Sequence, residues 1–270
     1  MLALIDGDIV VHRVGFTTNG DSLGIAKARA DEMLDNILIE TGATEYRIYL
    51  SDSTENNFRT QFYPSYKANR TAPKPLHYDD LKEHLLTKWE AAIALEQEAD
   101  DALGIEQCAI TRGDDDIETP SRFKSVICTI DKDLRQIPGL HWNFVKKEWQ
   151  EITPTEARKY FYRQLVIGDT SDNIVGVRGI GKVKAERLFS GADTEEALFT
   201  CTIQAYETWL RDEWTPEGKT TLKELDEFQW KQLYNIVLMT GIALKIRQTE
   251  GEIWTFPKQF SKLEPSLVQE

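Results

Sequence analysis

The sequence predicts an α/β fold, with a central, mostly parallel sheet flanked by helices, followed by a helical C-terminal region. Short apolar segments alternate with helix-compatible segments over the first two-thirds of the chain, which is typical of parallel sheets covered on both faces. After about residue 168 the segments read as helices alone. The 270 residues suffice for one large domain or two modest ones.

Each segment predicted as a strand ends in an aspartate. The three segments are LALID at 2–6, YRIYLSD at 46–52 and SVICTID at 125–131. Each combines a short apolar or β-branched run with a polar residue at its end. We therefore expect three parallel strands whose carboxyl ends carry carboxylates.

Helices are expected between these strands and after them. The expected ranges are 25–41, 79–92, 99–112, 181–190, 194–213 and 221–245. A further helix over 153–169 opens with Thr153 as N-cap, Pro154 at the first helical position and Glu156 three residues after the cap, which is a capping-box signature. Since no strand is predicted later, we expect an α/β domain at 1–168 and a helical domain at 169–270.

The charge distribution is uneven along the chain. The net charge is −13, which by itself argues against nucleic acid as a partner. Basic side chains nevertheless gather in 53–74 and in 178–187, each with a single acidic residue among them. They are Arg59, Lys67, Arg70 and Lys74 in the first stretch, and Arg178, Lys182, Lys184 and Arg187 in the second. These two stretches are the candidates for contacts with a polyanion.

Other composition features narrow the class of protein. No apolar run reaches the roughly 18–20 residues of a membrane span, and the N-terminus lacks the basic start of a signal peptide. The three cysteines are far apart, so we expect reduced thiols in a cytoplasmic protein without a membrane partner. The four histidines show no zinc-binding spacing.

Carboxylates accumulate where a parallel sheet places its functional crevice. Asp6, Asp52 and Asp131 close the predicted strands, and Asp8 and Asp133 follow two of them. The remaining acids of interest are Glu98, Asp100, Asp101, Asp169 and Asp172. A single aspartate after a strand is usually a turn residue or an N-cap, and acids in a first helical turn usually serve as caps, so the argument rests on their conjunction.

So many carboxylates in one crevice would repel one another and raise their pKa values unless a cation balanced them. Oxygen ligands without histidine or cysteine suit Mg²⁺ or Mn²⁺. Two such ions about 4 Å apart are a common device for cutting phosphodiesters, because one activates water and both stabilise charge on the phosphate. The acids therefore predict a two-metal site.

The stretch GVRGIGKVKAERL at 176–188 predicts a glycine turn that leads into a basic helix. Gly179 and Gly181 permit tight backbone conformations, and the amides of Gly179, Gly181 and Lys182 would point outward at a helix N-terminus, where phosphate binds well. Lys184 and Arg187 add positive charge. We expect a helix-hairpin-helix-type motif near 174–190 that grips a nucleic-acid backbone without reading bases; the alternative is a plain turn with a solvated basic helix.

Taken together, these motifs resemble the flap endonuclease / 5′–3′ exonuclease family, particularly its small bacteriophage members, over about residues 1–190. The matching motifs are LIDGD with Asp6, YLSDSTENNFR with Asp52, EADD with Glu98, Asp100 and Asp101, TIDKDL with Asp131 and Asp133, and GDTSDNI with Asp169 and Asp172, followed by GVRGIGK. YPSYKANR at 63–70 resembles the family's gateway stretch, where a lysine and an arginine contact the scissile phosphate. By this resemblance Lys67 and Arg70 take those two roles. Tyr66 either stacks on a terminal base or is a packed aromatic.

The resemblance implies a PIN-like 5′ nuclease core and a Mg²⁺-dependent 5′–3′ exodeoxyribonuclease or 5′ flap endonuclease. It implies that these acids bind two Mg²⁺ or Mn²⁺ ions, with Asp6, Asp52, Asp131, Lys67 and Arg70 as the catalytic set, and it leaves open a K⁺ ion at the glycine hairpin. The expected partner of the monomer is duplex DNA with a 5′ end or flap, with RNA–DNA hybrid (RNase H activity) as a further substrate. The expected role is phage DNA replication or recombination in the bacterial host cytoplasm.

Other classes of function remain open at this point. A haloacid-dehalogenase-type phosphatase would use Asp6 and Asp8 as nucleophile and acid, Ser51 after a strand, and GDTSD as a late metal motif. That scheme leaves EADD, DKD and GIGK without a role. A non-catalytic DNA-binding protein on the same scaffold would be expected to have a broken acid set. A metal-dependent RNase on a related fold is also compatible. In TAPKPLH, two prolines stand where the family's arch often continues as a helix.

Overall fold

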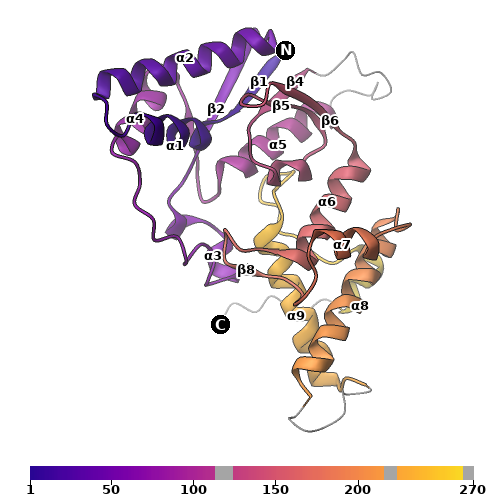
Figure 1. Ribbon diagram of the computed structural model, residues 1–270. Helices are drawn as coiled ribbons and strands as arrows, with labels where there is room; N and C mark the ends of the chain where they lie inside the picture. Colours follow the sequence, from indigo (N-terminus) through magenta and orange to yellow (C-terminus); the bar gives the residue numbers. More distant parts are fainter. Residues whose placement is uncertain (113–123, 216–223, 264–270) are drawn as a thin grey trace. The chain divides into compact units, whose positions relative to one another are not determined.

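The computed structural model describes residues 1–112, 124–215 and 224–263 (Figure 1). The chain forms two compact units. Unit 1 comprises Met1–Phe58, Thr71–Ala157 and Ile246–Glu252; unit 2 comprises Arg59–Arg70, Arg158–Lys245 and Ile253–Glu270. This division differs from a single boundary after residue 168. The residues from Arg158 onward group with the later helices, and Ile246–Glu252 groups with the sheet.

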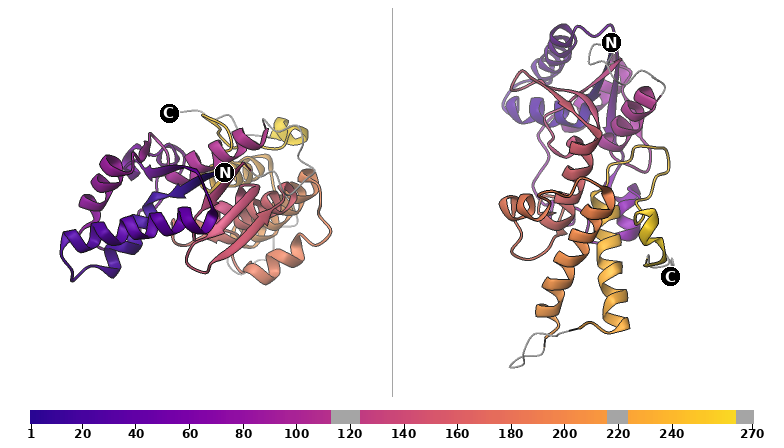
Figure 2. Two further views of the ribbon diagram at one scale, coloured as in Figure 1. Left: turned by 90° about the horizontal axis from the view of Figure 1, so that it is seen from above. Right: turned by 90° about the vertical axis from the view of Figure 1, so that its right-hand side faces the viewer.

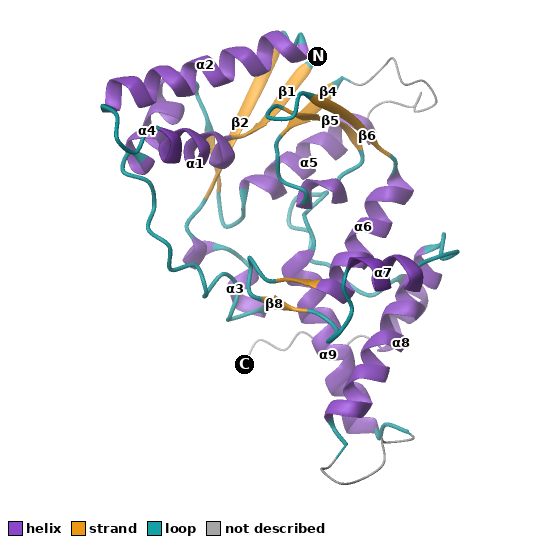
Figure 3. Cartoon of the chain, viewed as in Figure 1, coloured by secondary structure: helices purple, strands orange, loops and turns teal. Residues whose placement is uncertain are grey.

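Unit 1 is built on a six-stranded sheet (Figure 3). Its strands are β1 (Leu2–Asp6), β2 (Glu45–Ser51), β3 (Ala92–Ala94), β4 (Ser125–Cys128), β5 (Gly139–Asn143) and β6 (Glu148–Ile152). They lie in the order β3-β2-β1-β4-β5-β6. All neighbours are parallel except β5 and β6, which confirms the predicted α/β fold with a mostly parallel sheet.

Alternate side chains of the strands face opposite layers of helices, as the two-residue period of a strand requires. Ala3 and Ile5 of β1 join the larger core, which contains side chains of α1 (Gly7–Thr17), α2 (Leu23–Thr41) and α4 (Tyr78–Lys88). Leu4 joins a second core with Leu103 of α5 (Ala99–Arg112). β1 is thus buried on both faces, which explains its unbroken apolar sequence.

Unit 2 is mainly helical, as the sequence predicts for the C-terminal region. It contains α3 (Arg59–Phe62), most of α6 (Pro154–Ile167), the short hairpin of β7 (Gly168–Asp169) and β8 (Ile174–Val175), then α7 (Lys182–Leu188), α8 (Glu195–Glu213) and α9 (Glu227–Leu244). Helices α8 and α9 lie side by side (Figure 2). The hydroxyl of Tyr206 on α8 donates to the Leu165 carbonyl of α6 over 2.8 Å, and the rings of Phe161 and Trp254 pack 5.4 Å apart.

Several predicted elements agree closely with the structure. The strand at 2–6 and the helix at 99–112 are observed with those bounds. The capping box also forms, since the Glu156 carboxylate accepts from the Thr153 amide over 2.9 Å and the Thr153 hydroxyl accepts from the Glu156 amide over 3.2 Å. Of the helix predicted over 221–245, the structure shows Glu227–Leu244; positions 221–223 lie outside the described residues.

Other elements were absent from the prediction: α1, α3, β3, β5, β6 and the β7–β8 hairpin, whose first strand begins where the predicted helix over 153–169 ends at Ile167. Helix α1 follows β1 without a loop because the Asp6 side chain caps it, accepting from the Ile9 amide. Its valines continue the apolar run of β1, and this conceals the change from strand to helix. Within the described residues, no helix is both long and apolar enough to cross a membrane.

Candidate active site

Asp6 is the most deeply buried of the strand-end carboxylates. It closes β1 with 2% exposure, and its oxygens accept from the Ile9 amide over 3.1 Å and from the Thr129 hydroxyl over 2.8 Å. Burial, reinforced by the charges of Asp8 and Asp131, raises the pKa of Asp6 to about 7, although the two hydrogen bonds act in the opposite direction. Like charge is therefore concentrated at this end of β1.

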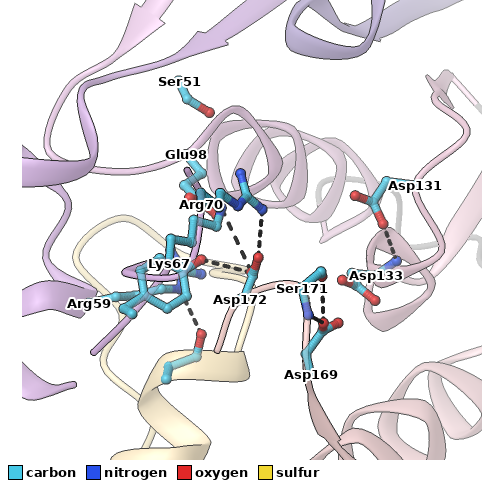
Figure 4. A network of polar contacts seen from close by, with 12 residues as sticks. Ser51, Arg59, Lys67, Arg70, Glu98, Asp131, Asp133, Asp169, Ser171 and Asp172 are labelled. Atoms are coloured by element: carbon cyan, nitrogen blue, oxygen red, sulfur yellow. Dashed lines mark hydrogen bonds and ion pairs between the residues drawn. The ribbon is translucent and has the colours of Figure 1, made fainter. Parts of the chain in front are cut away.

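Asp131 and Asp133 lie in the loop that follows β4 (Figure 4). The Asp133 amide donates to Asp131 Oδ1 over 2.8 Å, and the Asp131 amide donates to the Thr129 hydroxyl over 3.0 Å. Thr129 thus contacts both Asp6 and the Asp131 backbone. Asp133 begins the short 3₁₀ helix η3 (Asp133–Gln136), and both carboxylates are half-buried.

Asp52 and Asp8 lie near the end of β2. Asp52 accepts from the backbone amides of Glu96 and Ser53 over 3.0 and 2.7 Å, and these bonds hold its pKa below the usual range. Asp8 accepts from the Ser51 amide over 3.0 Å. Both acids therefore stabilise the loops around the strand end, in addition to any role toward a ligand.

The EADD motif lies at the start of α5. Asp101 is fully buried, and its two oxygens accept from the backbone amides of Glu98 and Arg247 over 3.1 and 3.0 Å. Glu98 and Asp100 are half-buried. Asp101 thus holds local backbone in place, which the motif alone did not reveal.

The carboxylates of unit 1 match a hard divalent cation in donor type, although they do not form a compact ligand cage. Among the described residues, no three acidic, histidine or cysteine side chains stand together as a ready-made metal site. The donors are oxygens only, and a divalent cation would offset the like charge that raises the pKa of Asp6. The residues therefore fit Mg²⁺ or Mn²⁺ in their chemistry.

In unit 2, Asp172 is surrounded by positive charge (Figure 4). Its carboxylate accepts from Arg70 Nη2 over 2.6 Å and from the Tyr66 hydroxyl over 3.2 Å, and Lys67 Nζ lies 3.8 Å from Oδ2. Tyr66 is 3% exposed, so the packed-aromatic alternative is the one observed; a base cannot stack on a covered ring.

The 63–70 stretch is fastened to the turn between β7 and β8. The Lys67 amide donates to the Asp172 carbonyl over 2.9 Å. The Asn173 amide group donates to the Ser65 carbonyl over 2.8 Å, and that of Asn69 to the Thr170 carbonyl over 2.9 Å. Lys67 and Asn173 both adopt left-handed backbone conformations, with φ of 55° and 59°. The cations and Asp172 are therefore held as one group.

Asp169, at the end of β7, forms a local turn. Its Oδ1 accepts from the Ser171 amide over 2.8 Å and from the Ser171 hydroxyl over 2.5 Å (Figure 4). Its exposure is 7%. The preceding Gly168 has φ of +75°, and a Cβ there would lie 2.4 Å from the Gly176 nitrogen, so glycine is required where the hairpin strands meet.

The glycine turn precedes α7, but the element before it is the β7–β8 hairpin rather than a helix that runs directly into the turn. Gly179 has φ of +80°, as the tight-turn prediction requires. Gly181 has φ of −103° and open space around it, so its backbone conformation does not itself require glycine. Lys182, Lys184 and Arg187 are exposed, while Arg178 pairs with Glu213 at 3.0 Å.

The sequence matches the model of a known protein family. The sequence model of the "5'-3' exonuclease, N-terminal resolvase-like domain" matches residues 1–162. The chain belongs to the 5′–3′ exonuclease family. The match includes the first four acidic motifs, and the family resemblance predicted from them is confirmed.

Relatives and solved structures agree with this membership. Flap endonuclease Xni of Shewanella sp. (strain W3-18-1) is 27% identical over 73% of this chain and 77% of its own. The 5′–3′ exonuclease of Bacillus subtilis is 25% identical, over 73% and 72%. The thermostable DNA polymerase I of Thermus thermophilus is 29% identical over 73% of this chain, which spans only 24% of the polymerase.

Two solved structures share the fold. One is the T5 5′-exonuclease with bound zinc, at a TM-score of 0.56, 14% identity and coverage of 90% of this chain and 88% of that chain. The other is a bacteriophage T5 flap endonuclease in a pseudo-enzyme–product complex with DNA and metal ions, at a TM-score of 0.56, 16% identity and coverage of 91% and 89%. The family's α/β nuclease fold is therefore present over most of the chain.

Sequence reasoning missed residues that position the acids. Thr129 is one, and a hydroxyl two residues before the TIDKD aspartate was its only local signal. Ser51 is another, since its hydroxyl accepts from the Ala99 amide over 2.9 Å at the start of α5. Arg247 is the third, and nothing near it in the sequence indicates its contact with Asp101.

Proposed function

We propose that this 5′–3′ exonuclease family member is a divalent-metal-dependent 5′ nuclease that hydrolyses DNA phosphodiesters at a 5′ end or flap. The observation that carries the proposal is the carboxylate cluster at the ends of β1 and β4, where burial and the charges of Asp8 and Asp131 raise the pKa of Asp6 to about 7. Such a cluster is costly without a cation. Family membership supplies the reaction class, and the metal-bound T5 structures support the cofactor.

The proposed ligand set is the full series of motif acids: Asp6, Asp52, Glu98, Asp100, Asp101, Asp131, Asp133, Asp169 and Asp172. Asp6, Asp52 and Asp131 are its proposed catalytic members. When bound, two Mg²⁺ or Mn²⁺ ions supply an activated water and stabilise charge on the scissile phosphate. The residues of the chain set the shape of the site: Thr129 orients Asp6 and Asp131, and Asp101 fixes the start of α5.

Lys67 and Arg70 are the proposed phosphate-binding cations. Asp172 holds Arg70 over 2.6 Å, and the left-handed backbone at Lys67 fixes where that side chain begins. Cations positioned in advance stabilise developing charge in a transition state without reorganisation. We propose that they act on the scissile phosphate, whereas the exposed Lys182 and Lys184 beside the Gly179 turn bind the duplex backbone.

The finer points of function are also proposals. We propose that the protein acts as a monomer in phage DNA replication or recombination and accepts RNA–DNA hybrids as well as DNA. The T5 relatives support the phage assignment. A K⁺ ion at the glycine hairpin is proposed on the family resemblance alone.

The test compares wild type with Asp131→Asn on 5′-labelled duplex, 5′-flap and RNA–DNA substrates, with Mg²⁺ or excess chelator. Asparagine retains an oxygen acceptor for the Asp133 amide but lacks the charge. We expect the rate to fall by a hundredfold or more, with the fold and DNA affinity retained, and chelation to abolish cleavage reversibly. A variant that keeps more than about a tenth of the wild-type rate at saturating Mg²⁺ would contradict the two-metal proposal.

The same assay separates the other classes of function. A phosphatase would release phosphate from a small phosphate ester and leave the labelled DNA intact. Its scheme needs Ser51 at the reacting phosphate, whereas the Ser51 hydroxyl accepts from the Ala99 amide. A non-catalytic DNA-binding protein would bind without cleaving under any metal condition.

A further inference from the structure

Residues 246–252, here called the strap, follow α9 but belong to unit 1. Ile246 is 4% exposed and joins the core of Leu4 and Leu103. The strap also passes close to α5, because a Cβ added to Gly104 would lie 2.4 Å from the Arg247 carbonyl oxygen. Glycine at position 104 is thus what allows the strap to approach the helix that carries the EADD motif.

Arg247 connects the strap to the start of α5. Its amide donates to Asp101 Oδ1 over 3.0 Å, and its Nη1 donates to Gln97 Oε1 over 2.9 Å. The guanidinium also lies 3.7 Å from the centre of the Phe58 ring. Arg247 is 8% exposed and Gln97 7%. A buried arginine therefore holds Asp101 through its backbone amide and Gln97 through its side chain. These two residues flank Glu98 and Asp100 in the sequence.

The strap also holds the second acidic loop. The Ile246 amide donates to Gln136 Oε1 over 3.1 Å, and the Gln248 side chain donates to the Gln136 carbonyl over 3.1 Å. Gln136 ends η3, the short helix that begins at Asp133, and it is 1% exposed. The two motifs are thus joined by one segment, even though Asp101 and Asp131 lie 30 positions apart in the sequence.

The strap is itself a closed turn. The Glu252 carboxylate accepts from the amides of Gln248 and Thr249 over 2.6 and 3.2 Å. Arg247 Nε donates to the Glu252 carbonyl over 2.9 Å, and Gly251 has φ of 68°. A segment closed by its own hydrogen bonds keeps its shape and can hold other groups in fixed positions.

We propose that the strap positions the carboxylates of EADD and of TIDKD for metal binding, with Arg247 as the positioning residue. This rests on the proposed function and extends it to a segment beyond residues 1–162 of the family match. Partners that hydrogen-bond ligands or their backbone set ligand geometry, and their loss typically costs about 10–100-fold in metal affinity. Arg247 acts through Asp101 and Gln97 and is not itself a ligand.

The test measures Mn²⁺ binding directly, by electron paramagnetic resonance of free Mn²⁺, for wild type, Arg247→Met and Arg211→Met. Arg211 is a partly buried arginine of α8 that pairs with Glu207, so its variant controls for the loss of one arginine. We expect Arg247→Met to bind Mn²⁺ about 10–100-fold more weakly and Arg211→Met to match wild type. Cleavage by Arg247→Met should recover as Mg²⁺ is raised, because metal occupancy is what it loses.

Gln97→Leu provides a second variant that removes one contact and keeps Arg247. We expect a smaller loss of Mn²⁺ affinity than in Arg247→Met. If Arg247→Met does not fold, Gln97→Leu alone tests whether the strap positions the metal ligands. Folded variants with wild-type Mn²⁺ affinity would overturn the role of the strap. A wild-type protein that binds no Mn²⁺ would instead overturn the proposed metal-dependent function, so the two failures are distinguishable.

Discussion

The two units treat buried carboxylates in opposite ways. In unit 1, Asp6 is buried beside the like charges of Asp8 and Asp131, and its pKa rises to about 7. In unit 2, Asp172 is half-buried, with 17% of its side chain exposed. Its carboxylate contacts Lys67, Arg70 and Tyr66. The first cluster is suited to a cation from solution, whereas Asp172 is already paired with two cations of the chain, in addition to its proposed role as a metal ligand.

This difference shows why the same residue type predicts two kinds of chemistry. A carboxylate near other carboxylates gains from a divalent metal, whereas one paired with lysine and arginine holds those cations for a phosphate. Changes that remove charge should therefore affect the clusters differently.

The largest expected effect tests the cations of unit 2. Lys67→Ala and Arg70→Ala should each lower the single-turnover cleavage rate by roughly a hundredfold, as losses of charge-stabilising groups do. Affinity for the same substrate, measured with Ca²⁺ in place of Mg²⁺, should fall much less. Lys74→Ala is the control, since Lys74 belongs to the same basic stretch but lies over the Tyr78 ring at 4.2 Å. Equal losses of rate and affinity would mean that Lys67 and Arg70 contribute only to DNA binding and not to stabilising the transition state.

Low pH should destabilise unit 1 through histidine, a residue type that unit 2 lacks. All four histidines lie in unit 1. Burial lowers the pKa of His141 to about 4 from 6.5. The unfolded chain then binds the proton more readily between these values, so stability is full above pH 6.5 and falls as the pH drops toward 4. The loss at pH 5 is about 2 kcal/mol.

His141→Gln isolates this term, because glutamine can still donate to the Ile137 carbonyl that His141 contacts over 2.9 Å. Denaturant unfolding at pH 5 and 7.5 should show a smaller acid loss in the variant than in wild type. Asp6 contributes with the opposite sign, since its raised pKa adds stability as the pH falls below about 7, and the comparison with wild type cancels it. An identical acid loss in both proteins would exclude His141 as the cause.

The same substitution, aspartate to asparagine, should change the free energy of unfolding differently in the two clusters. Asp172→Asn removes the charge that faces Lys67, whose side chain is 10% exposed, and should lower the free energy of unfolding by roughly 1–2 kcal/mol. Asp6→Asn removes like-charge repulsion and should leave metal-free stability at pH 8 unchanged or higher. The measurement is denaturant unfolding in chelator; a loss of equal size in both variants would refute the contrast.

The smallest effect concerns the exposed lysines in the first turn of α7, Lys182 and Lys184. Lys182→Ala and Lys184→Ala should each flatten the log–log salt dependence of duplex binding by roughly 0.9, because each lysine releases about one counterion. Gly179→Val should weaken binding further by straining the turn at φ of +80°, whereas Gly181→Val, at φ of −103°, serves as its matched control. A double lysine variant with the wild-type slope between 50 and 200 mM salt would return this stretch to a plain solvated turn.

The sequence predicts the parts of the fold in which local pattern and tertiary structure agree. The apolar run at 2–6, the helix at 99–112 and the Thr153 cap are decided by their own residues. The bounds of α1 depend instead on Asp6 turning from strand residue to helix cap, and the short β3 depends on pairing with β2. Such elements take their form from neighbours that a sequence pattern does not contain.

The candidate site shows the same division. The identity of the acids follows from their motifs, and Asp6 and Asp131 prove close enough for the charge of one to raise the pKa of the other. The engagement of Asp101 with the Arg247 amide, and of Asp52 with the Glu96 amide, joins residues that are 146 and 44 positions apart. Their use could not be inferred from local spacing.

The strap follows residues 158–245 of unit 2 in the sequence, and this order has a consequence for synthesis. A ribosome makes residues 246–252 after everything else in unit 1. Until then, Asp101 of the nascent unit has no contact with the Arg247 amide. Domains otherwise tend to fold as they emerge, from the N-terminus onward. Unit 1 would thus complete its acidic loops only after residues 246–252 have been made, and a chain interrupted before Ile246 would leave them incompletely held.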